Sequence, residues 1–490
     1  MRFYSFCRKG IDLEEVEIEI SLMPGLPMFH ITGLPDASIR ESLIRIKSAL
    51  RHQEFILPTK DQVLIHLSPS FEKKSSQGLD LAIAAAYLIK TGQIQMTEAK
   101  DTKIYFYGEL GLEGDVKSPA DIELLEDTPE SSLLITGPSE RPLDLFHGQI
   151  RNLKDLTEIR WLEPQFDSPA AIVKSNSEAE VHSHLEHMKF SKSYAELLTT
   201  VAVGEHNSFV AGPAGTGKTT LSRALHRVLR PPTQAEQKKI NKISRIARRS
   251  FCKRPYVAPH HSASDIALLG GGVPPQPGEV TRAQFGVLVL DEYLEFKHHV
   301  KESLREPIES HEITVCRTAG RVAFPADFLL VGTSNLCQCG EYVPNRPTKC
   351  GYSSTRCKSY LQRLSGPMLD RFEIVAFSHQ WKNKKGEESV SLAQIRQQVL
   401  EAQKFAKDSR GQVKMNSRLS LNECESLIDP FTRMNLMPEL PESHRRLMAL
   451  LRVARSLADM AESDKIQAQH IEQARLLTVK PFLDLKEAVR

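Results

Sequence analysis

Near its middle the sequence reads Gly212-Pro-Ala-Gly-Thr-Gly-Lys218-Thr219, a match to the phosphate-binding pattern G-x-x-x-x-G-K-[ST]. A short apolar run at residues 208–211 precedes it, and residues 221–229 follow with the apolar spacing of a helix. Strand, glycine-rich loop and helix in this order are the context that the pattern requires. A glycine-rich turn that carries Lys-Thr by chance is the alternative, and this context disfavours it.

The chemistry expected of the loop follows from its residues. The glycines let backbone N–H groups turn toward a polyphosphate without Cβ clashes, and the start of the helix adds partial positive charge. Lys218 is expected to reach the β- and γ-phosphates, and Thr219 to ligate Mg²⁺. ATP and Mg²⁺ are therefore the expected cofactors.

Two further predicted strands end in polar side chains. Residues 286–290 form an apolar run that ends at Asp291 and Glu292, as expected of a parallel strand buried on both faces. Asp291 would hold Mg²⁺ through water, and Glu292 would activate the attacking water. A second run, 328–332, leads to Asn335, whose amide would polarise the same water; a turn-forming Asn is the alternative. The residues expected to bind the nucleotide and its metal ion are Gly212, Pro213, Ala214, Gly215, Thr216, Gly217, Lys218, Thr219, Thr220 and Asp291.

The composition is that of a globular protein with several domains. The chain has 490 residues, of which 40% are hydrophobic and 26% charged, so about three domains are expected. No apolar run approaches the length of a membrane span, and the N-terminus lacks the long apolar region of a signal peptide, which predicts a cytoplasmic protein with no membrane partner. A net charge of +3 is too small to argue for nucleic acid by itself.

The part of the chain before about residue 165 has the pattern of a mixed α/β domain. Residues 16–22 and 63–67 predict strands, while 38–50 and 79–89 predict helices. These elements carry no recognisable catalytic set. Lysines stand beside serines at 73–76, but sequence neighbours rarely converge in space as a Ser–Lys dyad requires.

Several longer motifs accompany the phosphate loop. They are Gly25-Leu-Pro-Met-Phe-His-Ile-Thr-Gly-Leu-Pro-Asp36, Arg254-Pro-Tyr-Val-Ala-Pro-His-His-Ser-Ala-Ser264, Gly270-Gly-Gly-Val-Pro-Pro-Gln-Pro-Gly-Glu279, Val289-Leu-Asp-Glu292 and Arg363-Leu-Ser-Gly-Pro-Met-Leu-Asp-Arg371. Together they resemble the YifB/ComM family of magnesium-chelatase-like AAA+ ATPases. The chain departs from the family pattern at residues 189–197 ahead of the phosphate loop, in the last segment from Ile471, and at Gln77. Gln77 stands where the family carries a serine, which argues further against proteolysis.

This resemblance implies the organisation of the chain. It implies an α/β fold with a Lon-protease-like N-terminal domain at 1–165, an AAA+ P-loop core with a parallel sheet at 187–378 and a helical lid at 379–490. The polar composition of 166–186 predicts a linker between the first two. The resemblance further implies a homo-hexameric ring that acts on single-stranded or branched DNA, because ComM members act as helicases or branch-migration motors in natural transformation.

Two arginines gain roles from the same resemblance. Arg371 resembles the finger that completes the site of a neighbouring subunit, and Arg445, ahead of an apolar-periodic helix at 447–455, resembles the sensor arginine of the lid. Both would stabilise charge on the transferred phosphoryl group. Without the resemblance, each is an ordinary surface ion-pair partner.

Two segments, 268–278 and 312–324, are candidates for gripping DNA in a central pore, and the basic segment 238–249 is the next candidate for holding the strand. Residues 312–324 alternate around a glycine as a hairpin does, and their Arg317 and Arg321 would meet phosphates. Residues 268–278 are expected to be a flexible insertion, and residues 238–249 to be a helix with a basic face. A solvated hairpin tip and a solvated helix face are the alternatives.

Four of the eight cysteines crowd into the loop 337–357. This loop is rich in Gly and Pro and lacks a core of its own, so a metal ion would hold it together. Free thiols are the alternative, because Cys-x-Cys is a tighter spacing than the usual Cys-x-x-Cys. The candidate Zn²⁺ ligands are Cys337, Cys339, Cys350 and Cys357.

The function predicted from the sequence is ATP hydrolysis coupled to movement on DNA. Two other functions stay open at this point. One is the ATPase subunit of a magnesium chelatase, which needs partner subunits, and the other is a protein-remodelling ring built around the N-terminal domain. ATPase activity that DNA stimulates would separate the first function from both others.

Overall fold

The structure is a computed structural model, which describes the chain except for residues 1, 34–36, 70–76, 96–101, 126–131, 140–145, 147, 162–184, 248, 273–274, 318–319, 345–349, 351, 365, 382–387, 437–442 and 490. Contacts divide the chain into two units. The first consists of Met1–Ser177, Ser244–Ser250 and Thr314–Val322, and the second of Glu178–Ile243, Phe251–Ile313 and Ala323–Arg490. Most of the predicted linker and the whole of 73–76 lie outside the described residues.

The core of the first unit is a mixed sheet of seven strands. In chain order the strands of this unit are β1 (Phe3–Lys9), β2 (Asp12–Pro24), β3 (Met28–Thr32), β4 (Asp61–Ser68), β5 (Lys103–Phe106), β6 (Glu109–Leu110), β7 (Val116–Lys117), β8 (Ser132–Thr136) and β9 (Gln149–Asn152). The sheet order is β3-β4-β2-β1-β5-β8-β9, and β6 and β7 form a separate pair. Strand β2 is antiparallel to both of its neighbours, whereas the other adjacent pairs of the sheet are parallel.

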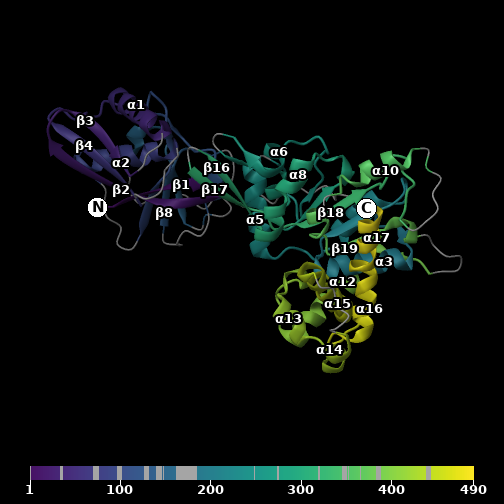
Figure 1. Cartoon of the computed structure of the whole chain (residues 1–490). Coiled ribbons are helices and arrows are strands. Elements are labelled where there is room, and N and C mark those ends of the chain that lie inside the picture. The colour runs from purple at the N-terminus through teal and green to yellow at the C-terminus, as the bar shows by residue number, and fades with distance from the viewer. Residues whose placement is uncertain are drawn as a thin grey trace. The chain divides into compact units, whose positions relative to one another are not determined.

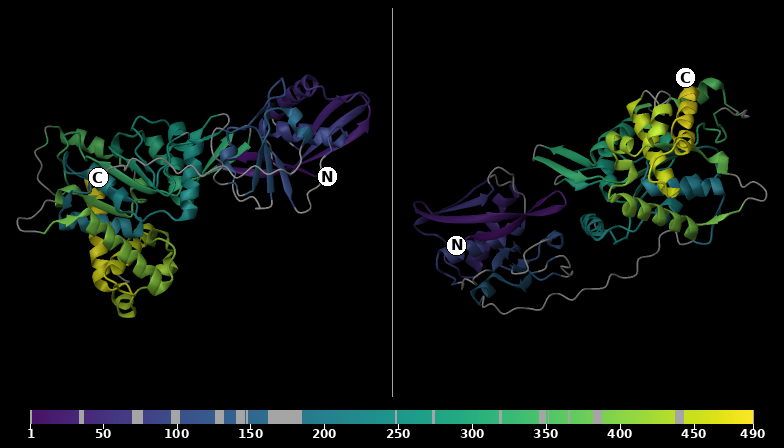
Figure 2. Two further views of the ribbon diagram at one scale, coloured as in Figure 1. Left: turned by 180° about the vertical axis from the view of Figure 1, so that it is seen from behind. Right: turned by 90° about the horizontal axis from the view of Figure 1, so that it is seen from below.

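Two helices pack on this sheet, α1 (Ala37–His52) and α2 (Asp80–Lys90), with the 3-10 turn η1 (Gln77–Leu79) leading into the second. Figure 1 and Figure 2 show both helices together on the sheet, with α2 against β1, β2 and β5. Helix α2 is buried over most of its length because small apolar side chains let it pack closely. The two strands and two helices predicted for this part are all confirmed. The likeness to the Lon protease domain stays a prediction.

The core of the second unit is a parallel sheet of five strands. They are β11 (Ser208–Ala211), β12 (Tyr256–Val257), β15 (Val287–Leu290), β18 (Leu329–Ser334) and β19 (Ile374–Phe377). Their order is β12-β15-β18-β11-β19, and every neighbouring pair is parallel. All but β12 are buried along their whole length, which explains their continuous apolar sequences. The three strands predicted in this part are confirmed.

The strand order determines which loops meet. Strand β18 lies between β11, which leads into the phosphate loop, and β15, which leads to Asp291. The carboxyl ends of parallel strands lie at one edge of the sheet, so the loops after these three strands converge there. Gly332 in β18 makes room beneath them, since a Cβ at this position would come within 3.0 Å of the rings of Phe209 and Phe372.

Helices surround this sheet and extend beyond it to the C-terminus. Those of the sheet region are α3 (Lys192–Gly204), α4 (Lys218–Val228), α5 (Gln234–Ile246), α6 (Asp265–Leu269), α7 (Glu279–Arg282), α8 (His298–Ser303), α9 (Arg305–Ser310), α10 (Ser354–Leu361) and α11 (Gly366–Leu369). Those that follow are α12 (Leu392–Arg410), α13 (Leu421–Ser426), α14 (Pro430–Leu436), α15 (His444–Met460), α16 (Ala468–Thr478) and α17 (Lys480–Val489). Helices α12 to α16 gather into one bundle (Figure 1), as expected of a lid.

Short elements complete the chain. The remaining strands are β10 (Lys189–Phe190), β13 (Gly270–Gly271), β14 (Gln276–Pro277), β16 (Glu312–Arg317), β17 (Gly320–Pro325) and β20 (Val390–Ser391). The remaining 3-10 turns are η2 (Ile122–Leu124), η3 (Leu156–Trp161), η5 (Tyr293–Glu295), η6 (Ser378–Trp381) and η7 (Asn416–Arg418). No helix within the described ranges has the length and apolar character needed to cross a membrane.

The three segments considered for DNA contain regular structure. Strands β16 and β17 pair with each other, which confirms the hairpin. Helix α5 confirms the basic helix up to Ile246 and buries Ile240 and Ile243. The segment 268–278, expected to be a flexible insertion, contains the end of α6 and the hydrogen-bonded pair β13–β14 among its described residues, and its flexibility stays a prediction.

Candidate nucleotide-binding site

The phosphate loop joins β11 to α4, as the sequence predicts. Gly217 caps the helix with φ 85°, in the left-handed region that favours glycine. Gly212 lies close to η6, because a Cβ on it would come within 2.3 Å of Ser378 Oγ. The Ser378 hydroxyl also lies 2.5 Å from Thr216 Oγ1, which donates to Pro213 O at 2.7 Å. The loop is thus fixed from inside and from the neighbouring strand end.

Lys218 lies inside the loop. Its ammonium group donates to Gly212 O at 3.0 Å, to Pro213 O at 2.6 Å and to Asn335 Oδ1 at 2.9 Å. Burial lowers the pKa of Lys218, and the nearby Asp291 carboxylate opposes this shift. A cation held at the start of a helix is suited to bind phosphate oxygens.

Asp291 receives hydrogen bonds from two neighbouring elements. Thr219 Oγ1, in the first turn of α4, donates to Asp291 Oδ2 at 3.0 Å. Thr333 Oγ1, near the end of β18, donates to Asp291 Oδ1. Both oxygens of the carboxylate are therefore oriented next to the hydroxyl expected to ligate Mg²⁺, so Thr219 and Asp291 fit the hard oxygen donor set that this ion prefers.

Glu292 follows Asp291 with φ 55°, in the left-handed region. This conformation turns its side chain away from the strand direction, and the side chain is 62% exposed. Its Oε2 lies 3.5 Å from Nδ1 of His261. An exposed carboxylate at the end of β15 can reach a water molecule beside a bound phosphate, which is the position a general base needs.

The two predicted arginines lie elsewhere in the second unit. Arg371 Nη2 lies 2.8 Å and Arg445 Nη2 2.6 Å from the same atom, Glu309 Oε1. They line a cavity of about 320 Å³ together with Arg418 and Arg452, and among its described lining residues none belongs to the phosphate loop. Arg371 also donates to a backbone carbonyl, that of Pro367, at 2.6 Å. The structure therefore brings the two arginines together, but not to the phosphate loop of their own chain.

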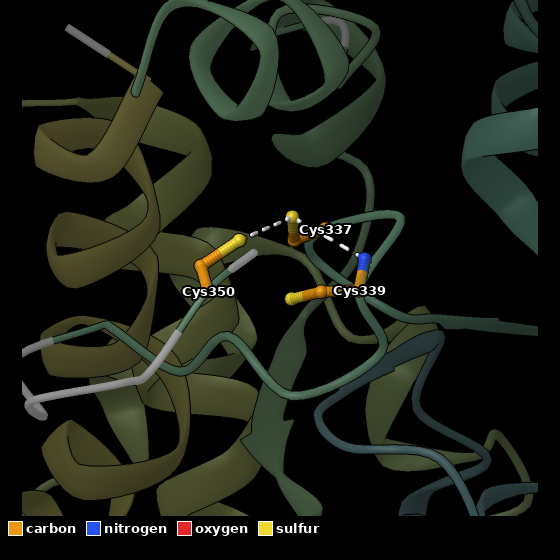
Figure 3. A group of neighbouring side chains, drawn as sticks. All are labelled: Cys337, Cys339 and Cys350. Atoms are coloured by element: carbon orange, nitrogen blue, oxygen red, sulfur yellow. Dashed lines mark hydrogen bonds between the residues drawn. The ribbon is translucent and has the colours of Figure 1, made fainter. Parts of the chain in front are cut away.

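The four predicted cysteines do meet. Cys337 Sγ lies 3.2 Å from Cys357 Sγ and 3.6 Å from Cys350 Sγ, and the last two sulfurs are 3.4 Å apart. Cys339 Sγ lies within 4.8 Å of both Cys337 Sγ and Cys350 Sγ. Figure 3 shows the side chains of these three residues gathered together. The backbone N–H of Tyr352 lowers the pKa of Cys350 to about 7, whereas burial raises that of Cys337.

The hairpin arginines are only partly described. Arg321 is exposed on β17, and its Nη2 donates to Thr314 Oγ1 at 3.4 Å. The side chain of Arg317 lies outside the described residues. The exposure of Arg321 is what a phosphate contact requires.

Comparison with known proteins gives the family. Its models match three parts of the chain: magnesium chelatase, subunit ChlI, at 184–385; subunit ChlI of Mg-chelatase at 16–125; and the ChlI C-terminal region at 389–477. The chain is 31% identical to competence protein ComM of Haemophilus influenzae over 495 residues, which covers 96% of each chain. The chain belongs to the YifB/ComM family. Protein YifB of Salmonella typhimurium is 29% identical over 490 residues and that of Escherichia coli 30% over 486, each covering 95% of this chain and 94% of the relative.

Membership of this magnesium-chelatase-like family implies ATPase activity with ATP and Mg²⁺. In this YifB/ComM protein, several residues at the site could not be predicted from the sequence pattern alone. The sequence pattern does not predict Thr333, because its contact with Asp291 depends on the strand order. His261 lies in the motif 254–264, whose pattern does not indicate its contact with Glu292. Ser378 and Gly340 approach the loop from distant parts of the chain. The one local signal for Thr333 is its hydroxyl at the end of a predicted strand, two residues before Asn335.

The first prediction separates binding from hydrolysis. Lys218→Ala should weaken ATP binding by about 10- to 100-fold or more, because it removes a charged partner of the phosphates. Glu292→Gln should retain binding but lower the hydrolysis rate by at least about 100-fold, because it removes only the base. Fluorescence titration with a labelled ATP analogue and phosphate release measure the two effects. Similar ATP affinity in the wild type and in Lys218→Ala would contradict the phosphate-loop assignment.

The second prediction concerns Thr333. Thr333→Val keeps the shape of the side chain but removes the hydroxyl that orients Asp291, so half-saturation of the ATPase should need about tenfold more Mg²⁺. Thr333→Ser keeps the hydroxyl and should behave like the wild type. Mg²⁺ titrations at saturating ATP make the comparison. Equal Mg²⁺ dependence of the valine and serine variants would show that this hydrogen bond does not tune the metal site.

Proposed function

We propose that the chain is a hexameric ATP-driven motor that moves on DNA, acting as a helicase or in branch migration during natural transformation or recombination. The observation that carries the proposal is the separation of Arg371 and Arg445 from the phosphate loop of their own chain. A phosphoryl transfer site needs a cation against the charge that develops on the γ-phosphate. A neighbouring subunit that supplies both arginines would complete the site.

The contacts of Glu309 support a site shared between subunits. Arg371 comes from the turn after α11 and Arg445 from the start of α15, so the sheet region and the predicted lid each contribute one guanidinium to the same carboxylate. Glu309 itself is 51% exposed, and the side chain of Arg445 is 47% exposed. Arg445 is therefore accessible to a partner chain, whereas Arg371, whose side chain is 5% exposed, lies behind the carboxylate that it shares with Arg445. Repeating such a head-to-tail contact closes a ring if the rotation between subunits allows it.

We propose DNA as the substrate of the motor. The relative from Haemophilus influenzae is a competence protein, and this chain matches it along almost its whole length. Arg321 on the β16–β17 hairpin offers an exposed cation for a phosphate. Since DNA and ATP are both present in the cytoplasm, we propose that the motor works there.

A magnesium chelatase-type ATPase subunit is the second candidate, because all three matching family models bear that description. A protein-remodelling ring would share the same ATPase chemistry. Both alternatives predict an ATPase rate that does not respond to DNA. Purified protein that hydrolyses ATP faster with forked or three-stranded DNA, and moves the branch point of that DNA, would support the motor over both.

The third prediction tests the shared site. Arg371→Ala and Glu292→Gln subunits should each be nearly inactive alone. When they are co-expressed with different tags and purified as mixed rings, about a quarter of random interfaces should pair an intact Glu292 with an intact Arg371, and ATPase activity should return in that proportion. Mixed rings that stay as inactive as either parent would count against catalysis by Arg371 in trans.

The fourth prediction concerns DNA contacts. Replacing Arg317 and Arg321 together with alanine should weaken binding of single-stranded DNA regardless of its sequence, because these side chains would read phosphates. The log–log salt slope should decrease in magnitude by roughly 0.7 for each lost contact, and DNA stimulation of the ATPase should disappear while basal activity persists. Lys238→Ala with Lys239→Ala, on the exposed part of α5, is the matched control. An unchanged slope in the hairpin variant and a reduced slope in the control would assign the contacts to α5.

A further inference from the structure

We propose that Cys337, Cys339, Cys350 and Cys357 bind a structural Zn²⁺ ion that braces the phosphate loop and Asn335, so that loss of the metal weakens ATP binding. The zinc site does not depend on the proposed motor function. Its effect on ATP rests on the nucleotide-binding role of the loop, which is part of that function.

The positions of the sulfur atoms fit a tetrahedral metal. Zn–S bonds of about 2.3 Å place the four sulfurs of a Cys₄ site about 3.8 Å apart. Three of the sulfurs here are 3.2, 3.4 and 3.6 Å apart, and the fourth, that of Cys339, lies within 4.8 Å of those of Cys337 and Cys350. These separations are far longer than the 2.05 Å or so of a disulfide. Four soft ligands with no oxygen donor among them favour zinc over Mg²⁺.

Backbone groups point at the sulfurs as they do around bound thiolates. The N–H of Cys339 donates to Cys337 Sγ, and the N–H of Glu341 donates to Cys339 Sγ, each at 3.5 Å. Such outer contacts orient metal ligands and stabilise their negative charge. Cys337 is 1% exposed, and a buried thiolate needs a cation beside it.

The same turn contacts the phosphate loop. The N–H of Gly340 closes the cysteine turn by donating to Cys337 O at 2.9 Å. The carbonyl oxygen of Gly340 accepts a hydrogen bond from the N–H of Ala214, in the phosphate loop, at 2.8 Å. Asn335 stands two residues before Cys337 and accepts from Lys218 at 2.9 Å. An ion that fixes Cys337 and Cys339 therefore fixes both contacts that the turn makes with the nucleotide site.

Cys357 connects the cluster to the residues that follow Glu292. Cys357 lies in α10, and the next turn of that helix contacts Glu295 through Tyr360, whose hydroxyl donates to Glu295 Oε1 at 2.8 Å. Arg356 of the same helix donates to Gln338 Oε1 at 2.9 Å. Zinc would join the β18 loop to α10, and α10 to the residues just after Glu292.

The first measurement is metal content. Full-length wild-type protein should contain about one zinc per chain by elemental analysis, and Cys350→Ser and Cys357→Ser should lose it. Cys252→Ser, outside the cluster, is the matched control and should keep it. Wild type that holds no zinc, takes up none from added Zn²⁺, or holds iron with visible absorbance would overturn the site.

The second measurement is ATP affinity at fixed Mg²⁺. As a milder treatment than substitution, the zinc of wild-type protein is also removed with a reversible mercurial reagent and a chelator. It is then restored with thiol and Zn²⁺ alone. Metal-free protein that keeps its far-UV circular dichroism should bind a labelled ATP analogue about tenfold more weakly, and restored protein should recover. Affinity that is unchanged without zinc would overturn the bracing. Absence of ATP binding in the zinc-loaded protein would refute the nucleotide site and the bracing with it, while the zinc content would still decide the metal site.

Discussion

The nucleotide site depends on the carboxylate of Asp291. It stands at the end of β15, and its two oxygens accept hydrogen bonds from Thr219 of the phosphate-loop helix and from Thr333 of β18. This arrangement requires β18 to lie between β11 and β15, because only then do hydroxyls from both neighbouring elements reach one carboxylate. The parallel sheet thus does more than supply a core. Its strand order sets the distance between the group expected to hold the phosphates and the group expected to hold the metal ion.

The intervening strand has a second consequence. Lys218 meets Asn335 from the loop after β18, so the residue expected to sense the γ-phosphate already contacts the residue expected to bind it. The same loop then turns at Gly340, where its carbonyl accepts from Ala214. The phosphate loop, Asn335 and the cysteine cluster are therefore connected by hydrogen bonds between residues close together in the chain, and not by one long element. A shift in the position of any one of the three is therefore transmitted to the other two through a few bonds.

The sequence was most informative where local pattern determines structure. The apolar runs at 208–211 and 286–290 predicted strands, the second of them buried and parallel, and the residues that follow both runs were expected to bind one nucleotide and its metal ion. Contacts that depend on strand order or on distant segments could not be predicted, such as those of Thr333 with Asp291 and of His261 with Glu292. The pairing of β13 with β14 in the segment 268–278 could not be predicted either, because its glycines locally indicate a flexible loop. The convergence of Arg371 and Arg445 on Glu309 had no local signal at all.

That convergence restricts how the three positions can change during evolution. Arg371 is 5% exposed, and loss of Glu309 would leave two neighbouring guanidinium groups without their shared anion. A substitution at 309 is therefore tolerated best when one of the arginines changes with it, and substitutions at the three positions are not additive. The three positions are therefore expected to change together, although they come from three separate segments: α9, the turn after α11 and α15.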